Sequence, residues 1–164
     1  MAEIGYVTLA EADAYVATHY ISTDNLRTSW EALSSEDRSA LLLRSFETIE
    51  ILPFSGRKTD PQQPYSFPRY PSQEVPKEIK NAQIENALSS ADTSTAEEAA
   101  HYGRLWQFGV QSYSIGNLSE HISEGAWSSG TTNSAASGIV SSVATRLLRP
   151  FLVGCYRIAG GRCQ

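Results

Sequence analysis

Residues 53–76 read PFSGRKTDPQQPYSFPRYPSQEVP and hold six of the seven prolines in the chain. Proline lacks a backbone N–H and keeps the residue before it in extended conformations, so this stretch cannot be helical. A connector of this length is uncommon in a small domain unless it is functional or disordered. Its four aromatic and three basic residues argue against disorder, because they can hold the chain against a neighbouring surface. We therefore expect an ordered, proline-rich loop laid across a helical body.

The segment before the loop predicts the most regular helix. Residues 36–51 place Leu42, Phe46 and Ile49 on one face, and two acidic residues in the first turn suit the helix dipole. Pro53 ends this periodicity. We expect this segment to be the central core helix of the protein.

Shorter helices are expected on either side. Residues 8–19 begin with Thr8 and Glu11 at the spacing of a capping box, and a second short helix is expected within residues 21–33. After the loop, an apolar face predicts a helix over residues 76–91. The expected fold class is therefore mainly α, a small helical bundle with a long proline-rich loop.

The pattern changes after this helix. Residues 95–102 could add a short turn of helix, and alternating apolar and polar residues over 105–122 predict a β-hairpin or a pair of extended arms. Residues 123–138 are rich in serine, glycine and threonine, which is typical of a flexible linker. We expect residues 1–122 to form one helical domain that includes the hairpin.

The carboxy-terminal residues 139–164 carry an apolar stripe after this linker. Such a stripe left in water usually marks an interaction surface, so we expect an arm that docks on a partner or on a neighbouring subunit. The expected contact residues are Val143, Leu147, Leu148, Arg149, Phe151 and Tyr156. The alternative is that the segment folds back as one more helix of its own bundle.

Composition limits the function. The chain of 164 residues fits one domain, and 13 basic against 18 acidic side chains give a net charge of −5. That balance argues against a nucleic-acid-binding protein. The sequence has no long apolar run and no leader-like amino terminus, so we expect no membrane span, no signal peptide and synthesis in the cytosol. Cys155 and Cys163 are expected to be reduced thiols.

The sequence offers no catalytic or metal-binding motif. The GRKT run at residues 56–59 lacks the spacing of a phosphate-binding loop, and His19, His101 and His121 stand apart from one another and from the cysteines. Serine never occurs in a nucleophile-elbow pattern. We therefore expect no enzyme activity, no cofactor and no metal site.

The loop carries the one cluster with binding chemistry. Its members are Arg57, Lys58, Tyr65, Phe67, Arg69 and Tyr70. Aromatic and cationic side chains together are how proteins hold single-stranded nucleic acid. The same residues suit an interface between subunits, where the aromatic rings anchor the loop and the basic groups pair with carboxylates. The negative net charge favours the subunit interface.

A combination of motifs resembles a known family. YVTLAEADAYVATHY near the amino terminus, GRKTDPQQPYSFPR in the loop and VPKEIKNAQIENAL after it resemble the small head–tail connectors of tailed phages. These are also called head-completion or adaptor proteins. The resemblance covers residues 6–91 well and the terminal LLRPFL more loosely.

The resemblance implies a structural protein of the virion. It implies a homo-oligomeric ring, a dodecamer in this family, which lies in the neck of the phage beneath the portal protein and next to a tail-completion or neck protein. Genomic DNA would pass through the lumen without specific binding, and the protein would be made in the host cytoplasm. Sequences of this type are also labelled as single-stranded-DNA-binding proteins of a primosomal kind, which is the alternative function.

Overall fold

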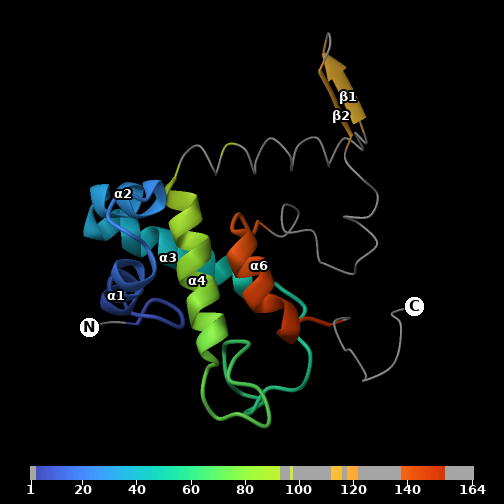
Figure 1. Ribbon diagram of the computed structural model, residues 1–164. Helices are drawn as coiled ribbons and strands as arrows, with labels where there is room; N and C mark the ends of the chain where they lie inside the picture. The colour runs from blue at the N-terminus through green and yellow to red at the C-terminus, as the bar shows by residue number, and fades with distance from the viewer. Residues whose placement is uncertain (1–2, 93–96, 98–111, 116–117, 122–137, 154–164) are drawn as a thin grey trace.

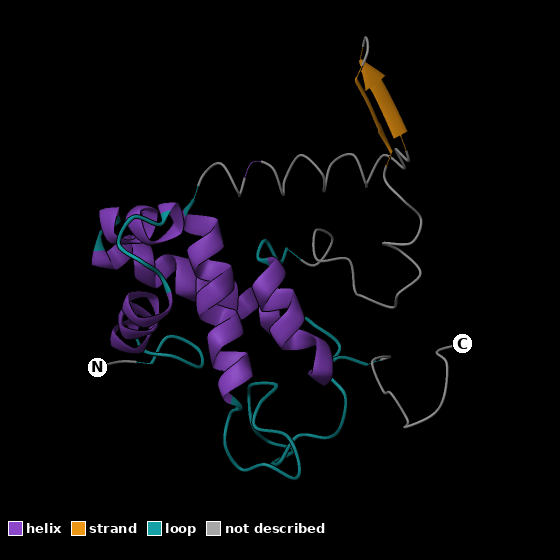
Figure 2. Ribbon diagram, in the orientation of Figure 1, coloured by secondary structure: helices purple, strands orange, loops and turns teal. Residues whose placement is uncertain are grey.

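The computed structural model describes residues 3–92, 97, 112–115, 118–121 and 138–153. In these residues the protein is mainly helical, as its sequence predicts. The elements are α1 (Leu9–His19), α2 (Asn25–Ala32), α3 (Ser35–Glu50), α4 (Lys77–Ala91), β1 (Ser112–Ile115), β2 (Leu118–His121), α6 (Ser142–Leu148) and the 3-10 helix η2 (Arg149–Phe151). Figure 1 shows α4 between the amino-terminal helices and α6. In Figure 2 the proline-rich loop, drawn in teal, folds beneath the end at which α4 begins.

The central helix of the bundle is α4. Residues of α4 belong to both hydrophobic clusters of the core, as do residues of α3. One cluster also contains residues of α6 and the proline-rich loop, and the other also contains residues of α1 and α2. Every residue from Ala82 to Ser89 is buried. In α3, Leu42, Phe46 and Ile49 are buried as expected. The expectation that this earlier helix holds the central position needs correction, because α4 lies between the other elements (Figure 1).

Polar side chains of α4 are buried because other segments supply their hydrogen-bond partners. The Gln83 amide donates to the carbonyl of Ile4 at 2.7 Å, and its oxygen accepts from the Tyr6 N–H at 3.1 Å. Asn86 accepts from the Val140 N–H at 2.8 Å, just before α6. Hydrophobic periodicity predicts that polar residues such as these face solvent. The sequence pattern therefore does not indicate the central position of α4.

The first turn of α1 is capped as predicted. The Thr8 hydroxyl accepts from the Glu11 N–H at 3.2 Å, and the Glu11 carboxylate accepts from the Thr8 N–H at 2.7 Å. These bonds satisfy N–H groups that the start of a helix leaves free. Before them, Gly5 has a φ of 73°, and a Cβ at this position would lie 2.4 Å from the Phe46 ring. Only glycine fits this turn.

The described carboxy-terminal residues, 138–153, belong to the same core. Those buried in the cluster that also contains Phe54 of the loop are Ile139, Ala144, Leu148 and Leu152. The backbone is also tied to the start of the loop, since the Ser55 N–H donates to Phe151 O at 2.7 Å and the Val153 N–H to Pro53 O at 2.9 Å. Of the two alternatives drawn from the sequence, these residues adopt the helix that folds back on its own bundle.

The strands β1 and β2 form an antiparallel pair, with Ile115 opposite Leu118. They form the β-hairpin predicted within residues 105–122. The predicted linker at residues 123–138 and the predicted turn of helix at 95–102 lie almost entirely outside the described residues.

Candidate functional site

Arg69 organises the proline-rich loop from within. Its guanidinium donates to the backbone carbonyls of Ser55 at 2.8 Å, Ser66 at 3.2 Å, Phe54 at 3.2 Å and Gly56 at 2.5 Å. The planar fork of arginine reaches several acceptors at once, which the compact ammonium of lysine does not. The guanidinium of Arg69 thus donates to carbonyls of its own loop. The sequence predicts different partners, namely carboxylates of another subunit.

Gln63 and a short antiparallel contact complete the loop. The Gln63 amide donates to the carbonyls of Tyr65 and Pro68, both at 2.9 Å. The Tyr70 N–H donates to the Arg57 carbonyl at 2.9 Å, so the two ends of the tip lie side by side. The GRKT, glutamine and FPR residues that carry the family resemblance are therefore residues that shape this loop.

An exposed ledge stands on the loop. The Arg57 guanidinium carbon lies 4.6 Å from the centre of the Tyr70 ring, a distance typical of a cation–π contact, and Tyr70 is 61% exposed. A hollow of about 460 Å³ is lined by Arg57, Lys58, Thr59 and Pro61. We call these four residues together with Tyr70 the Arg57 ledge. It presents an aromatic ring next to two cationic side chains.

A tyrosine–glutamate pair fixes the other side of the loop to the helical body. The Tyr6 hydroxyl donates to the Glu50 carboxylate at the end of α3, and the same hydroxyl accepts from the Phe67 N–H at 3.1 Å. The second Glu50 oxygen accepts from the Ser66 N–H at 2.9 Å. Burial raises the pKa of the Tyr6 hydroxyl far above its ordinary value, and the hydrogen bond to Glu50 raises it further. The hydroxyl therefore remains a donor. The loop is thereby anchored through its backbone.

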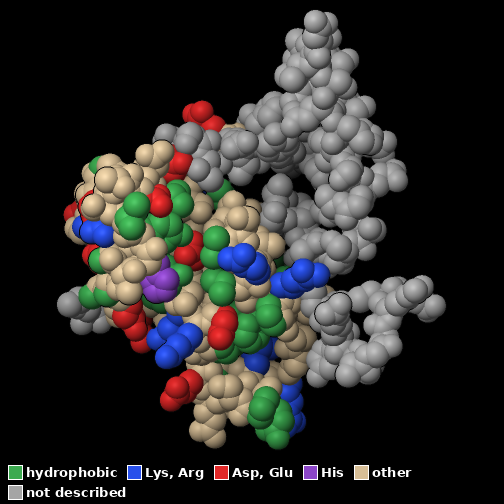
Figure 3. Space-filling model, viewed as in Figure 1, with side chains coloured by type: hydrophobic (Ala, Val, Ile, Leu, Met, Phe, Trp, Pro, Cys, Tyr) green, Lys and Arg blue, Asp and Glu red, His purple; other side chains and the backbone are tan. Residues whose placement is uncertain are grey.

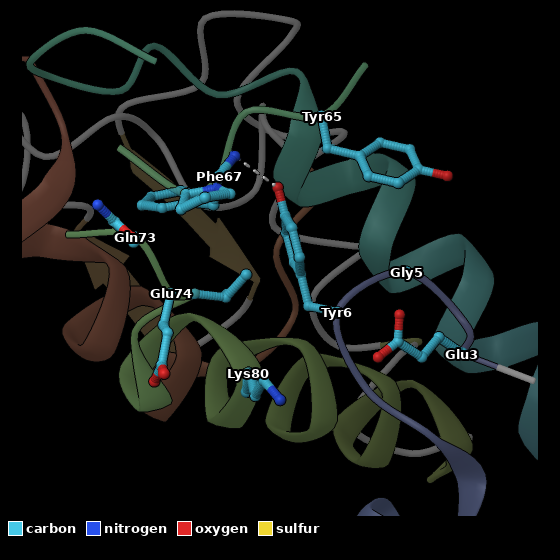
Figure 4. Close-up of a pocket in the computed structure, with 10 residues that line it drawn as sticks. Glu3, Gly5, Tyr6, Tyr65, Phe67, Gln73, Glu74 and Lys80 are labelled. Atoms are coloured by element: carbon cyan, nitrogen blue, oxygen red, sulfur yellow. Dashed lines mark hydrogen bonds between the residues drawn. The ribbon is translucent and has the colours of Figure 1, made fainter. Parts of the chain in front are cut away.

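A second hollow, of about 390 Å³, lies between the loop, the amino-terminal residues and the start of α4 (Figure 4). Its apolar lining consists of Tyr6, Tyr65, Phe67, Pro68 and Val75, and its polar side chains are Glu3, Gln73, Glu74 and Lys80. Tyr6 and Phe67 are buried, whereas Tyr65 is 46% exposed. We call this hollow the Tyr65 pocket.

The six loop residues predicted for a subunit interface divide into surface and interior. Arg57, Tyr65 and Tyr70 are exposed, and Lys58 is partly buried, with its ammonium donating to the Gln63 carbonyl at 3.2 Å. Phe67 is part of the hydrophobic core, and the guanidinium of Arg69 is occupied by carbonyls of its own loop. The sequence alone does not distinguish an aromatic ring that anchors a loop from one that the loop exposes to solvent.

The residues predicted for docking by the carboxy-terminal segment are mostly packed inward. Leu148 is 1% exposed. Those that are partly buried are Val143, Leu147 and Phe151, and Arg149 is exposed. Tyr156 lies outside the described residues.

Two acidic residues have structural roles that the sequence does not reveal, Glu50 and Glu85. Glu85, on α4, is buried and accepts from the hydroxyls of Tyr15 at 2.8 Å and Tyr20 at 2.7 Å. Burial, and then the hydrogen bond to Glu85, raises the pKa of both tyrosines. This triad joins α1 to α4. Nothing in the spacing of either glutamate distinguishes it from a solvent-facing one.

The part of the chain that the structure describes contains no group of three or more histidine, cysteine or acidic residues that could hold a metal ion. His19 is exposed and stacks on Tyr15, with ring centres 3.9 Å apart. The side chains of the other two histidines and of both cysteines lie outside the described part. Within that same part, no helix is both long enough and apolar enough to cross a membrane.

Net charge is a poor guide to the surface of this protein. Figure 3 shows acidic, basic and hydrophobic side chains interspersed over one face. Although the whole chain has a net charge of −5, residues 53–76 contain three basic and two acidic side chains. Attraction for a charged ligand depends on the local field, so the loop can receive an anion that the chain as a whole would repel.

A family model described as "Putative DnaT-like ssDNA binding protein" matches residues 5–161, nearly the whole chain. Comparison with curated proteins and with solved structures gave no match.

This match overturns the identification with the head–tail connectors. The predicted function of a virion neck protein is therefore wrong. The predicted partners are wrong as well, namely a dodecameric ring of copies, the portal, a tail-completion protein and DNA that passes through without specific binding. The resemblance is misleading because its loop motif contains Gln63 and Arg69, which shape the loop. Residues that determine the conformation of a loop do not by themselves indicate which ligand the loop binds.

Proposed function

The chain belongs to the DnaT-like family, and we propose that it binds single-stranded DNA, the alternative function considered from the sequence. The observation that carries this proposal is the family match over residues 5–161. The proposed role is of a primosomal kind, and it is a binding role rather than a catalytic one.

The Arg57 ledge supplies the chemistry that such binding needs. Stacking of a base on an aromatic ring contributes about 1–3 kcal/mol, and it requires a base that is not already paired within a duplex. Tyr70 presents an exposed ring for this contact, with Arg57 over it and Lys58 next in the chain. Because Arg57 covers one face of the ring, the base stacks on the other face. The two cations then meet the phosphates on either side of that base.

This arrangement predicts a shallow dependence on salt. Each phosphate contact on a single strand contributes about −0.7 to the slope of log K against log salt concentration. Contacts from Arg57 and Lys58 therefore predict a slope of about −1.4 for the ledge. Arg57→Ala should reduce its magnitude by about 0.7.

The test is a titration of a dye-labelled single-stranded oligonucleotide, followed by fluorescence anisotropy. Tyr70→Ala is expected to weaken binding about five-fold or more, whereas Tyr70→Phe retains the ring and most of the affinity. Arg44→Ala, which removes an exposed arginine of α3 outside the loop, is the charge control for Arg57→Ala. No binding by the wild-type protein would refute the function. Equal binding by Tyr70→Ala, with unchanged circular dichroism, would refute the site.

A further inference from the structure

The Tyr65 pocket adjoins the Arg57 ledge, and stacking on Tyr70 leaves it unused. Its volume of about 390 Å³ falls within the range of small-molecule pockets, roughly 300–1,000 Å³. We propose that this pocket receives one unstacked base of the bound strand and that it selects bases carrying an exocyclic amino group. The proposal rests on the function proposed above and adds a specificity to it.

The apolar lining suits a flat aromatic ligand. Tyr6 and Phe67 are 5% and 3% exposed, with ring centres 6.0 Å apart in an edge-to-face arrangement, and the Phe67 N–H donates to the Tyr6 hydroxyl. Tyr65 packs edge-to-face on Phe46, with ring centres 5.0 Å apart, yet remains nearly half exposed. These walls are fixed before any ligand arrives, so little ordering is required when a base enters.

The charged lining favours a base over a phosphate. Glu3 and Glu74 outnumber Lys80, and the Lys80 ammonium lies 3.6 Å from a Glu11 oxygen, which already offsets part of its charge. In Figure 4 the Glu3 carboxylate points toward the Tyr6 side chain. A phosphate would be repelled by this lining and attracted by the cations of the Arg57 ledge. A neutral base meets no such repulsion.

The two carboxylates also determine which base is preferred. An ionised carboxylate only accepts hydrogen bonds. Adenine, cytosine and guanine each carry an exocyclic amino group that donates. Thymine donates only through its ring N3–H, which lies between two carbonyl oxygens that a carboxylate repels. Gln73 can donate or accept, so it does not discriminate among bases. Glu3 and Glu74 are therefore the specificity-determining residues of the pocket.

The pocket and the ledge are close enough to act on one strand. Pro68 lines the pocket and Tyr70 belongs to the ledge. Because these residues are two positions apart in the chain, their Cα atoms lie within about 8 Å of each other. A short single strand can therefore stack one base on Tyr70 and insert another into the pocket.

The experiment compares the affinities of the full-length protein for oligo-dC and oligo-dT of equal length at neutral pH. Both are pyrimidine strands of the same ring size, and cytosine presents an amino group where thymine presents a carbonyl oxygen. Wild-type protein is expected to bind oligo-dC more tightly by about ten-fold or more, the ratio that corresponds to one hydrogen bond to a charged acceptor. The double variant Glu3→Gln, Glu74→Gln is expected to bring the ratio close to one. Removing two negative charges raises the affinity for both strands alike, so the ratio, and not either affinity, is the measurement.

Glu78→Gln is the matched control, because Glu78 is an exposed acidic residue in the first turn of α4 and does not line the pocket. It should change both affinities together and leave the ratio intact. A wild-type ratio near one, a ratio that survives in the double variant, or a ratio that falls equally in Glu78→Gln would each overturn the selectivity of the pocket while the proposed function stands. Failure to bind either strand would instead overturn the proposed function.

Discussion

Replacing Arg69 with lysine is expected to loosen the proline-rich loop without removing its positive charge. The guanidinium makes three part-buried hydrogen bonds to backbone carbonyls, at 2.8, 3.2 and 3.2 Å, and a fourth that is exposed. A lysine ammonium at the same place retains about one of the part-buried bonds. Counting about 1 kcal/mol for each bond lost gives a decrease of about 2 kcal/mol in the free energy of unfolding. Urea denaturation followed by circular dichroism should show a lower midpoint with an unchanged slope.

Arg57→Lys is the control for this measurement. Arg57 lies on the same loop, is exposed and contacts the Tyr70 ring, so this change should alter the free energy of unfolding by less than about 0.5 kcal/mol. If Arg69→Lys lowers the midpoint no further than Arg57→Lys does, the reasoning is wrong. Arg69 would then not be the residue that organises the loop.

Three further changes test the fold. Leu148→Ala should lower the free energy of unfolding by about 2–5 kcal/mol, because this side chain is 1% exposed, and a loss below about 1 kcal/mol in urea denaturation would show that the segment is detached from the core. Gly5→Ala should cost about 2–4 kcal/mol in thermal unfolding, since φ is 73° and the new Cβ would meet the Phe46 ring at 2.4 Å; an unchanged Tm would contradict this turn. Glu11→Gln should flatten the dependence of stability on acid pH. The hydrogen bond from the Thr8 backbone N–H lowers the pKa of Glu11 below its ordinary value, and the hydrogen bond from the Thr8 hydroxyl lowers it further. The ionised Glu11 carboxylate therefore stabilises the fold fully above about pH 4.3, and this stabilisation is lost as the pH falls through the lower pKa of the folded state. Denaturation midpoints at about pH 6 and about pH 3 measure this, and an equal pH dependence in wild type and variant would refute it.

The residues of the proposed binding site could be only partly predicted, because their exposure depends on tertiary contacts that the sequence does not show. The sequence predicts a subunit interface at the loop cluster, and the exposed members of that cluster include Arg57 and Tyr70 of the proposed site. Its buried members could not be separated from them, because an aromatic residue suits both a core and a stacking surface. The Tyr65 pocket escaped prediction altogether, since it joins the loop to Glu3 and Tyr6, residues far away in the sequence.

The sequence by itself determined the features that depend on neighbouring residues. The prolines of residues 53–76 exclude a helix whatever surrounds them, and Thr8 and Glu11 cap α1 through atoms three residues apart. The tertiary structure alone decided that α4 is central, that the described carboxy-terminal residues pack on their own bundle, and that Arg69 binds its own loop. Each of these depends on a hydrogen-bond or packing partner distant in the chain, such as Ile4 for Gln83 or Ser55 for Arg69. Periodicity records only whether a side chain is polar, and only the folded chain shows whether a polar side chain meets water or a partner.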